Sequence, residues 1–202
     1  MRVIAFGDSH TYGEELPGGG GHGLAGKFGY DQPSPVAWPQ LIADQLSYEC
    51  VNLAQPGYSN KEILISILKY NFQPDDRALV LWTHIARDVI FEIGGTDVKV
   101  SPNRIKDNFK AKYYYMSHGE HDMKISAWLH VSHAASHFHA QQIKFGMATY
   151  DAWDSDLCVG TNYININKTF RDHAVDLAKD NMHLGVQSHV NMSRQIISDL
   201  GW

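Results

Sequence analysis

The stretch Val3-Ile4-Ala5-Phe6-Gly7-Asp8-Ser9 passes without a break from an apolar run into a polar turn. A short apolar run that ends at a glycine is typical of a strand buried on both faces, as in a parallel sheet. Later runs of the same character predict three more strands, at residues 49–53, 78–82 and, with a weaker pattern, 143–149. The chain therefore begins with the predicted first strand of a parallel sheet, followed by a polar loop.

Helical patterns lie between and after these runs. They cover residues 37–46, the segment that follows the capping box Ser59-Asn60-Lys61-Glu62, residues 126–142 and residues 185–200. Alternating strands and helices indicate an α/β architecture with right-handed crossovers. A length of 202 residues suits one hydrophobic core. We therefore predict one domain over residues 1–202, a three-layer α/β/α sandwich with a central parallel sheet.

Two insertions interrupt this rhythm. Residues 14–35 contain four consecutive glycines and several prolines, which predict a long loop. Residues 94–122 are polar at first and then aromatic, and Ile105, Phe109 and Tyr113 are spaced four apart. That spacing predicts a short amphipathic helix. The glycine run lacks the Gly-Lys-Ser/Thr ending of a phosphate-binding loop, so we interpret it as a rim of the functional site.

Composition excludes several classes of protein. A net charge of −5 opposes nucleic-acid binding, because such proteins usually carry a basic excess against phosphates. The apolar run at the N-terminus is too short for a signal-peptide core or a membrane span. We therefore expect a cytoplasmic protein with no membrane partner. In that compartment Cys50 and Cys158 are expected to be reduced thiols.

Polar residues follow the ends of the first three predicted strands. In open α/β sheets, ligands bind outside the carboxyl ends of the strands, so these residues are the first candidates for chemistry. The candidates are Gly7-Asp8-Ser9-His10, Ala54-Gln55-Pro56-Gly57 and Thr83-His84.

Ser9 is a candidate nucleophile. A serine hydroxyl needs a base to remove its proton, and that base is usually a histidine held by a carboxylate. Asp180 and His183 lie three residues apart, just before the last predicted helix. Taken separately, each piece is more often a turn or a helix cap, and with 12 histidines a chance Asp-x-x-His is unsurprising. Their joint placement favours catalysis.

Three segments resemble sequence blocks of the SGNH (GDSL-type) hydrolase superfamily. Residues 7–13 are similar to the first block, with His10 where leucine is common. Residues 52–59 are similar to the second block, whose glycine contributes a backbone donor. Residues 180–185, followed by His189, resemble the last block. The three segments occur in the order that the family has.

The resemblance implies a mechanism and a fold of the flavodoxin-like SGNH type. Ser9 would be the nucleophile, His183 the general base and then acid, and Asp180 the group that orients His183. The backbone N–H groups of Ser9 and Gly57 would contribute to an oxyanion hole. The reaction would be hydrolysis of a small-molecule or glycan ester, with an acetyl ester of a carbohydrate as the first expectation. No metal or organic cofactor would be needed.

The third block departs from the family pattern. The family normally has an asparagine after the third strand, and His84 stands there by position. An imidazole N–H can donate a hydrogen bond, so we predict His84 as a third oxyanion donor. The open alternative is that His84 is a spectator and that Thr83 or Arg87 contributes instead. Asp8, His10, Trp82 and Thr83 surround this point and are expected to contact substrate. The lost asparagine leaves an alternative open, a weak or inactive SGNH-fold module that binds glycans.

A histidine stripe supports a third hypothesis, a metal-dependent protein. His130, His133 and His137 follow one side of a predicted helix. No carboxylate or cysteine completes that stripe, so we expect a partly exposed flank and no metal site. The altered third block also resembles divergent SGNH-like proteins of phages, which would place the chain in a virion or have it modify a host surface glycan. No residue pattern specifies the acyl group, the alcohol portion or the oligomeric state.

Overall fold

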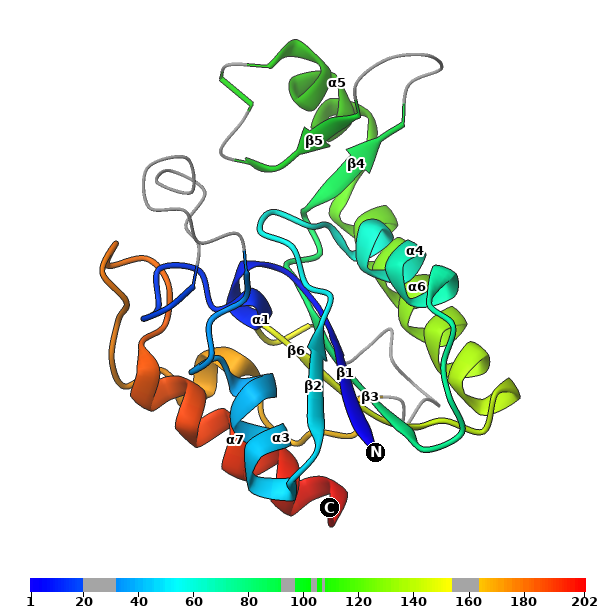
Figure 1. Cartoon of the computed structure of the whole chain (residues 1–202). Helices are drawn as coiled ribbons and strands as arrows, with labels where there is room; N and C mark the ends of the chain where they lie inside the picture. The colour runs from blue at the N-terminus through cyan, green and yellow to red at the C-terminus, as the bar shows by residue number, and fades with distance from the viewer. Residues whose placement is uncertain (20–31, 92–96, 103–104, 107, 154–163) are drawn as a thin grey trace.

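A four-stranded parallel sheet forms the centre of the molecule (Figure 1). The computed structural model describes residues 1–19, 32–91, 97–102, 105–106, 108–153 and 164–202. The sheet has the order β2-β1-β3-β6, and each neighbouring pair is parallel. Its strands are β1 (Arg2–Phe6), β2 (Glu49–Asn52), β3 (Asp76–Trp82) and β6 (Lys144–Thr149). The four predicted strands are confirmed, each to within about two residues.

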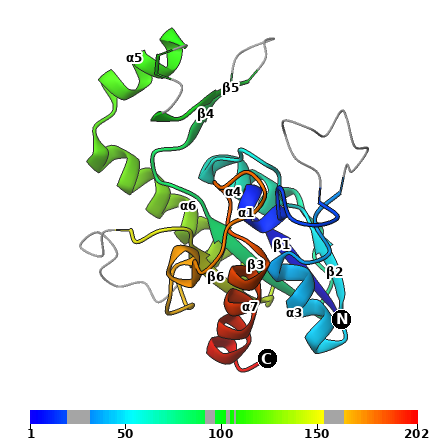
Figure 2. The same cartoon turned by 90° about the vertical axis from the view of Figure 1, so that its left-hand side faces the viewer.

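Helices cover both faces of this sheet (Figures 1 and 2). One face packs against α3 (Trp38–Leu46) and α7 (Val186–Leu200), and the other against α4 (Asn60–Lys69) and α6 (Glu120–Ala140). The predicted three-layer α/β/α arrangement is therefore confirmed. The capping box at Ser59 is present and begins α4, since Ser59 and Glu62 each bond the other's backbone N–H.

The first strand shows why its sequence is continuously apolar. Val3 packs in the cluster with α3 and α7, whereas Ile4 and Phe6 pack in the cluster with α4 and α6. All three side chains are fully buried. Side chains alternate between the faces of a strand, so in a strand covered on both faces every side chain is buried and an apolar residue is favoured at each position.

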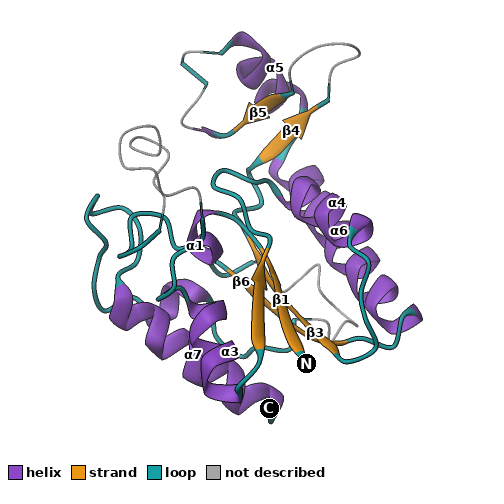
Figure 3. Cartoon of the chain, viewed as in Figure 1, coloured by secondary structure: helices purple, strands orange, loops and turns teal. Residues whose placement is uncertain are grey.

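The insertion predicted at residues 94–122 contains more structure than the sequence indicates. An antiparallel hairpin of β4 (Asp88–Ile90) and β5 (Val98–Val100) leads to α5 (Phe109–Ser117), beyond the carboxyl edge of the main sheet (Figure 3). Asn108 caps α5, so the helix begins at Phe109 and leaves Ile105 outside. Phe109 and Tyr113 are 77% and 72% exposed. The predicted short helix is therefore present, but Ile105 lies outside it, and Phe109 and Tyr113 form no buried apolar face.

The described helices also bear on other expectations. None of them combines the length and apolarity that crossing a bilayer requires. Helix α6 begins at Glu120, six residues before its predicted start. The sequence did not indicate these residues as helical because they carry no apolar stripe.

Cys50 is a partly buried free thiol, and burial raises its pKa to about 12. Cys158 and the last two glycines of the run at 18–21 lie outside the described residues.

Candidate active site

Ser9 lies at the first position of a short helix, α1 (Ser9–Tyr12), directly after β1. Asp8 caps this helix by accepting a hydrogen bond from the His10 N–H at 3.0 Å. The turn into the helix requires Gly7, because a Cβ there would lie 2.1 Å from the Thr11 hydroxyl. Ser9 itself is 4% exposed. These local constraints hold Ser9 at the carboxyl edge of the sheet.

The Asp8 carboxylate is the centre of a buried network. Its Oδ2 accepts hydrogen bonds from the Thr83 hydroxyl at 2.7 Å and from the Arg87 guanidinium at 2.8 Å. Asp8 and Thr83 are both fully buried. Asn60 fixes Thr83 in turn by accepting its backbone N–H at 2.9 Å. The sequence predicts that Asp8 and Thr83 contact substrate, but this placement favours the role of supports for the turn that carries Ser9.

Electrostatics keep Asp8 ionised. Burial opposes its charge, but the charges on His10 and Arg87 and the hydrogen bonds from Thr83 and the His10 N–H lower its pKa below 3.8 overall. Burial also lowers the pKa of His10 to about 4, so His10 is neutral at pH 7. Arg87 is therefore the cation that matters for Asp8 at neutral pH.

Asp8→Asn is expected to lower the free energy of unfolding by about 2–3 kcal/mol, because the hydrogen bonds to Arg87 and Thr83 lose their charged acceptor. Urea unfolding at pH 7 measures this change. Asp75→Asn makes the same charge change at an exposed position and is the control. Because the folded-state pKa of Asp8 lies below 3.8, its contribution is present at neutral pH and is lost as the pH falls through that lower pKa. A loss no larger than that of the control would contradict the supporting role.

The second loop is tied to the first. Asn52 donates from its side chain to the Thr11 carbonyl at 2.8 Å, and the Gln55 N–H donates to the Gly7 carbonyl at 3.2 Å. Gly57 has a φ of 76°, in the left-handed region that glycine adopts most easily. The loop that contains Gly57 therefore lies against the turn before Ser9.

His183 and Asp180 form a close pair. Nδ1 of His183 lies 2.6 Å from Oδ2 of Asp180, while Oδ1 of Asp180 accepts the N–H groups of Met182 and His183, both at 3.0 Å. Asn181 makes the tight turn possible with a φ of 56°, which asparagine tolerates. Burial opposes ionisation, but the hydrogen bonds from His183 and Met182 lower the pKa of Asp180 overall. Asp180 is therefore an ionised partner that orients the His183 ring.

A row of four aromatic rings joins the separate blocks of sequence. The His183 ring lies 5.0 Å from that of His10, the His10 ring stacks on Tyr150 at 4.2 Å, and Tyr150 meets His84 edge-on at 4.7 Å. The segment before α7 thus reaches α1, as Figure 2 shows. Tyr150 was missed by sequence reasoning, although it directly follows β6. The rule that directs attention to the carboxyl ends of strands identifies this position too.

Nε2 of His183 faces a second carboxylate in this structure. It lies 3.4 Å from Oε2 of Glu14, and the side-chain hydrogen bonds of the described residues include none between Ser9 Oγ and His183. Catalytic hydrogen bonds are often long or misaligned without substrate, so this geometry does not exclude the pair. Glu14 is a further site residue that the sequence did not indicate.

His84 is held by a carboxylate of its own. Its Nδ1 lies 2.7 Å from Oδ2 of Asp151, which follows Tyr150. A neutral imidazole that donates Nδ1–H to a carboxylate has only an acceptor left at Nε2. His84 can therefore donate from Nε2 only as an imidazolium, which sets a condition on its predicted role.

The predicted substrate contact Trp82 and the motif residue His189 both lie in the core. Trp82 is fully buried in the cluster with α4 and α6, which favours packing over the predicted substrate contact. His189 accepts the Trp38 N–H through Nδ1 at 3.1 Å and thereby fixes the start of α3. Burial lowers the pKa of His189 to about 3, so it is neutral at physiological pH.

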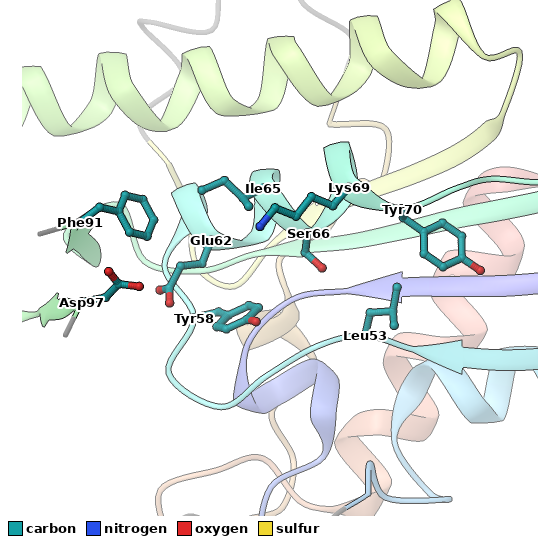
Figure 4. A pocket seen from close by; sticks show the side chains of 9 residues that line it. All are labelled: Leu53, Tyr58, Glu62, Ile65, Ser66, Lys69, Tyr70, Phe91 and Asp97. Atoms are coloured by element: carbon teal, nitrogen blue, oxygen red, sulfur yellow. The ribbon is translucent and has the colours of Figure 1, made fainter. Parts of the chain in front are cut away.

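A groove of about 440 Å³ lies next to the Gly57 loop (Figure 4). The loop after β2, helix α4 and the β4–β5 hairpin form its walls. Three aromatic side chains line it along with carboxylate, hydroxyl and ammonium groups: Leu53, Tyr58, Glu62, Ile65, Ser66, Lys69, Tyr70, Phe91 and Asp97. Apolar faces interspersed with hydrogen-bonding groups are typical of small-molecule sites.

The histidine stripe of α6 gains no metal-binding partners in the described part of the chain. There, no three His, Cys, Asp or Glu side chains gather closely enough to hold a metal ion. Gln141 Nε2 lies 2.9 Å from Nε2 of His137, at the exposed end of the stripe.

Comparison with known proteins identifies the fold. No family model matches the sequence, and no curated protein matches it. Among solved structures, a protein from Desulfitobacterium hafniense DCB-2, described as lipolytic and of the G-D-S-L family, has 13% identity and a TM-score of 0.53 over 98% of both chains. The acetyl xylan esterase Est2A from Butyrivibrio proteoclasticus has 13% identity and a TM-score of 0.56 over this whole chain.

A third neighbour is a carbohydrate esterase whose active site is described as having divergent catalytic and non-catalytic binding functions. It has 10% identity and a TM-score of 0.57 over 99% of this chain. The chain spans 64% of the length of this esterase and of Est2A. The chain has the fold of the SGNH (GDSL-type) hydrolases.

Proposed function

We propose that this chain is a serine hydrolase of carboxylic esters that works through an acyl-enzyme intermediate. One observation carries the proposal. The His183 ring, held by ionised Asp180 at 2.6 Å, lies 5.0 Å from the ring of His10, the neighbour of Ser9. A histidine with a carboxylate on one nitrogen, next to a serine at a helix start, is the arrangement that activates a hydroxyl nucleophile.

The proposed reaction proceeds in two halves. Ser9 Oγ attacks the ester carbonyl while Nε2 of His183 accepts the hydroxyl proton, which it then gives to the departing alcohol. The backbone N–H groups of Ser9 and Gly57 stabilise the oxyanion that forms. Water then hydrolyses the acyl-enzyme, with His183 acting again as the base. In the first half Nε2 of His183 has to contact the Ser9 hydroxyl, and in the second half the attacking water, in place of Glu14.

The proposed substrate is an acetyl ester of a carbohydrate. The supporting observations are the groove beside Gly57, with its aromatic and hydrogen-bonding side chains, and the two carbohydrate-active neighbours of the same fold. A panel of aryl esters from acetyl to octanoyl tests the acyl part. We expect the highest kcat/KM for acetyl and a steady fall with acyl length. A preference for octanoyl would contradict the short acyl group, and no turnover of any ester would contradict hydrolysis.

Where His84 is an imidazolium and can donate from Nε2, His84→Ala is expected to lower kcat by roughly 10²-fold with little change in KM, since an oxyanion donor acts mainly in the transition state. His84→Asn supplies an amide N–H whatever the pH and is expected to restore most of the rate. The two variants, compared with wild type across pH 5–9, measure this role. Equal activity of His84→Ala and wild type would show that His84 is a spectator.

The alternative function is a glycan-binding module without catalysis. The groove, and the contact of Nε2 of His183 with Glu14 at 3.4 Å, favour it as the second candidate. Calorimetric titration with acetylated and deacetylated xylan oligosaccharides separates the two functions. Binding of both, with no release of acetate, would favour the module.

A further inference from the structure

Glu14 is a second carboxylate partner of the proposed catalytic histidine. It follows α1, and its backbone N–H donates to the Ser9 carbonyl at 3.0 Å. Oε2 of Glu14 lies 3.4 Å from Nε2 of His183, while Oδ2 of Asp180 lies 2.6 Å from Nδ1. The side chains of Glu14 and His183 are only 10% and 18% exposed. The imidazole therefore lies between two poorly solvated carboxylates.

The two carboxylates and Ser9 need different things of the His183 ring. A neutral imidazole has one N–H and satisfies only one of two ionised carboxylates, whereas an imidazolium donates to both. The proposed reaction requires the opposite at Nε2, which has to be unprotonated and directed at Ser9. Glu14 and Ser9 thus need the same nitrogen in different protonation states.

The other groups placed around His183 do not supply a competing charge. The ring of His10, on α1, lies 5.0 Å from that of His183, and His189, on α7, interacts electrostatically with His183. Burial lowers their pKa values to about 4 and about 3, so both rings are neutral between pH 5 and 8. The ion pairs that His183 makes with described residues are those with the two carboxylates, Asp180 and Glu14.

We propose that Glu14 is a positioning residue that holds His183 as an imidazolium with Nε2 directed at Glu14, and thereby sets the acid limit of activity. The kinetic consequence rests on the proposed esterase function, whereas the contact between the two side chains does not. Glu14 in this role restrains the enzyme at low pH and releases it as the pH rises.

Glu14→Gln tests this role, because glutamine keeps the shape and removes the charge. We expect the acid limb of the kcat/KM profile to move to lower pH by about one unit, the usual effect of one close opposite charge. Activity on that limb would then rise roughly tenfold. The alkaline plateau would stay equal or fall, since the imidazolium formed in the transition state loses a partner. Glu15→Gln, at the next residue, is the matched control and should leave the profile unchanged.

A second measurement keeps the two proposals distinguishable. The ring ¹⁵N signals of His183, assigned by their loss in His183→Asn, report its protonation without substrate. We expect the protonated ring to persist to higher pH in wild type than in Glu14→Gln by the same interval. Identical NMR titrations, or a rate profile scaled equally at every pH, would overturn the role of Glu14. In a protein without esterase activity, the NMR titration still decides whether the two side chains are paired.

Discussion

Ser9→Ala is expected to lower kcat for an aryl acetate by at least roughly 10³-fold and to leave the fold intact. The nucleophile has no substitute in the proposed reaction, so only the catalysis that the oxyanion donors and binding supply would remain. The substitution removes one oxygen from a residue that is 4% exposed, in a helix whose cap is Asp8. Initial-rate kinetics and thermal melts of wild type and variant measure both effects.

Ser136→Ala is the matched control for this variant. Ser136 is an exposed residue of α6 whose hydroxyl donates to the Ser132 carbonyl one turn earlier. It should retain full activity and nearly full stability. An active Ser9→Ala enzyme that melts like wild type would remove Ser9 from the mechanism.

Asp180→Asn is expected to lower kcat by roughly 10³–10⁴-fold with a small change in KM. An amide at this position no longer favours the tautomer with Nδ1–H, nor does it stabilise the imidazolium that forms in the transition state. Asparagine keeps an oxygen that can accept the N–H groups of Met182 and His183, so the turn itself should survive. Steady-state kinetics at the alkaline plateau give the comparison.

The double variant with His183→Ala makes this test specific. Groups that act as one unit are not additive, so Asp180→Asn should cost little more in a background that already lacks His183. Additive losses would mean that Asp180 acts separately from His183, for example by holding the loop alone.

The sequence predicts the central sheet well because its strands are buried on both faces. A run such as Val3–Phe6 has no polar residue, because its side chains pack alternately into the apolar clusters on the two faces of the sheet. The strands of the β4–β5 hairpin have three residues each, too few for a periodic pattern, and were missed. The face of α5 was predicted from spacing alone. Two residues of that face, Phe109 and Tyr113, are exposed, whereas Tyr114 and Tyr115 on the same helix are partly buried.

In the candidate site, too, residues in local sequence motifs could be predicted, whereas roles that depend on long-range contacts could not. Ser9, Gly57 and the Asp180–His183 pair could be proposed because each follows a strand or precedes a helix in a local motif. Glu14 could not, because its importance arises from a contact with His183 across a long stretch of chain. Tyr150 and Asp151 follow β6, so their position could have been noticed, but their contacts with His10 and His84 could not.

Burial explains why two predicted substrate contacts, Asp8 and Thr83, are instead supports of the turn that carries Ser9. Asp8 and Thr83 carry polar groups at the right edge of the sheet, but their hydrogen bonds are made with each other and with Arg87. A sequence shows that a polar group is near a strand end. It does not show whether that group points outward or bonds its neighbours.

Mapping the site of a fluorophosphonate adduct tests the central claim most directly, because such probes phosphonylate only a serine that a base has activated. Peptide mass spectrometry of the treated wild-type protein is expected to find one adduct, on Ser9, and to find none when His183 is replaced by alanine. An adduct on a different serine, or an unmodified Ser9 after prolonged treatment at the alkaline plateau, would contradict the account.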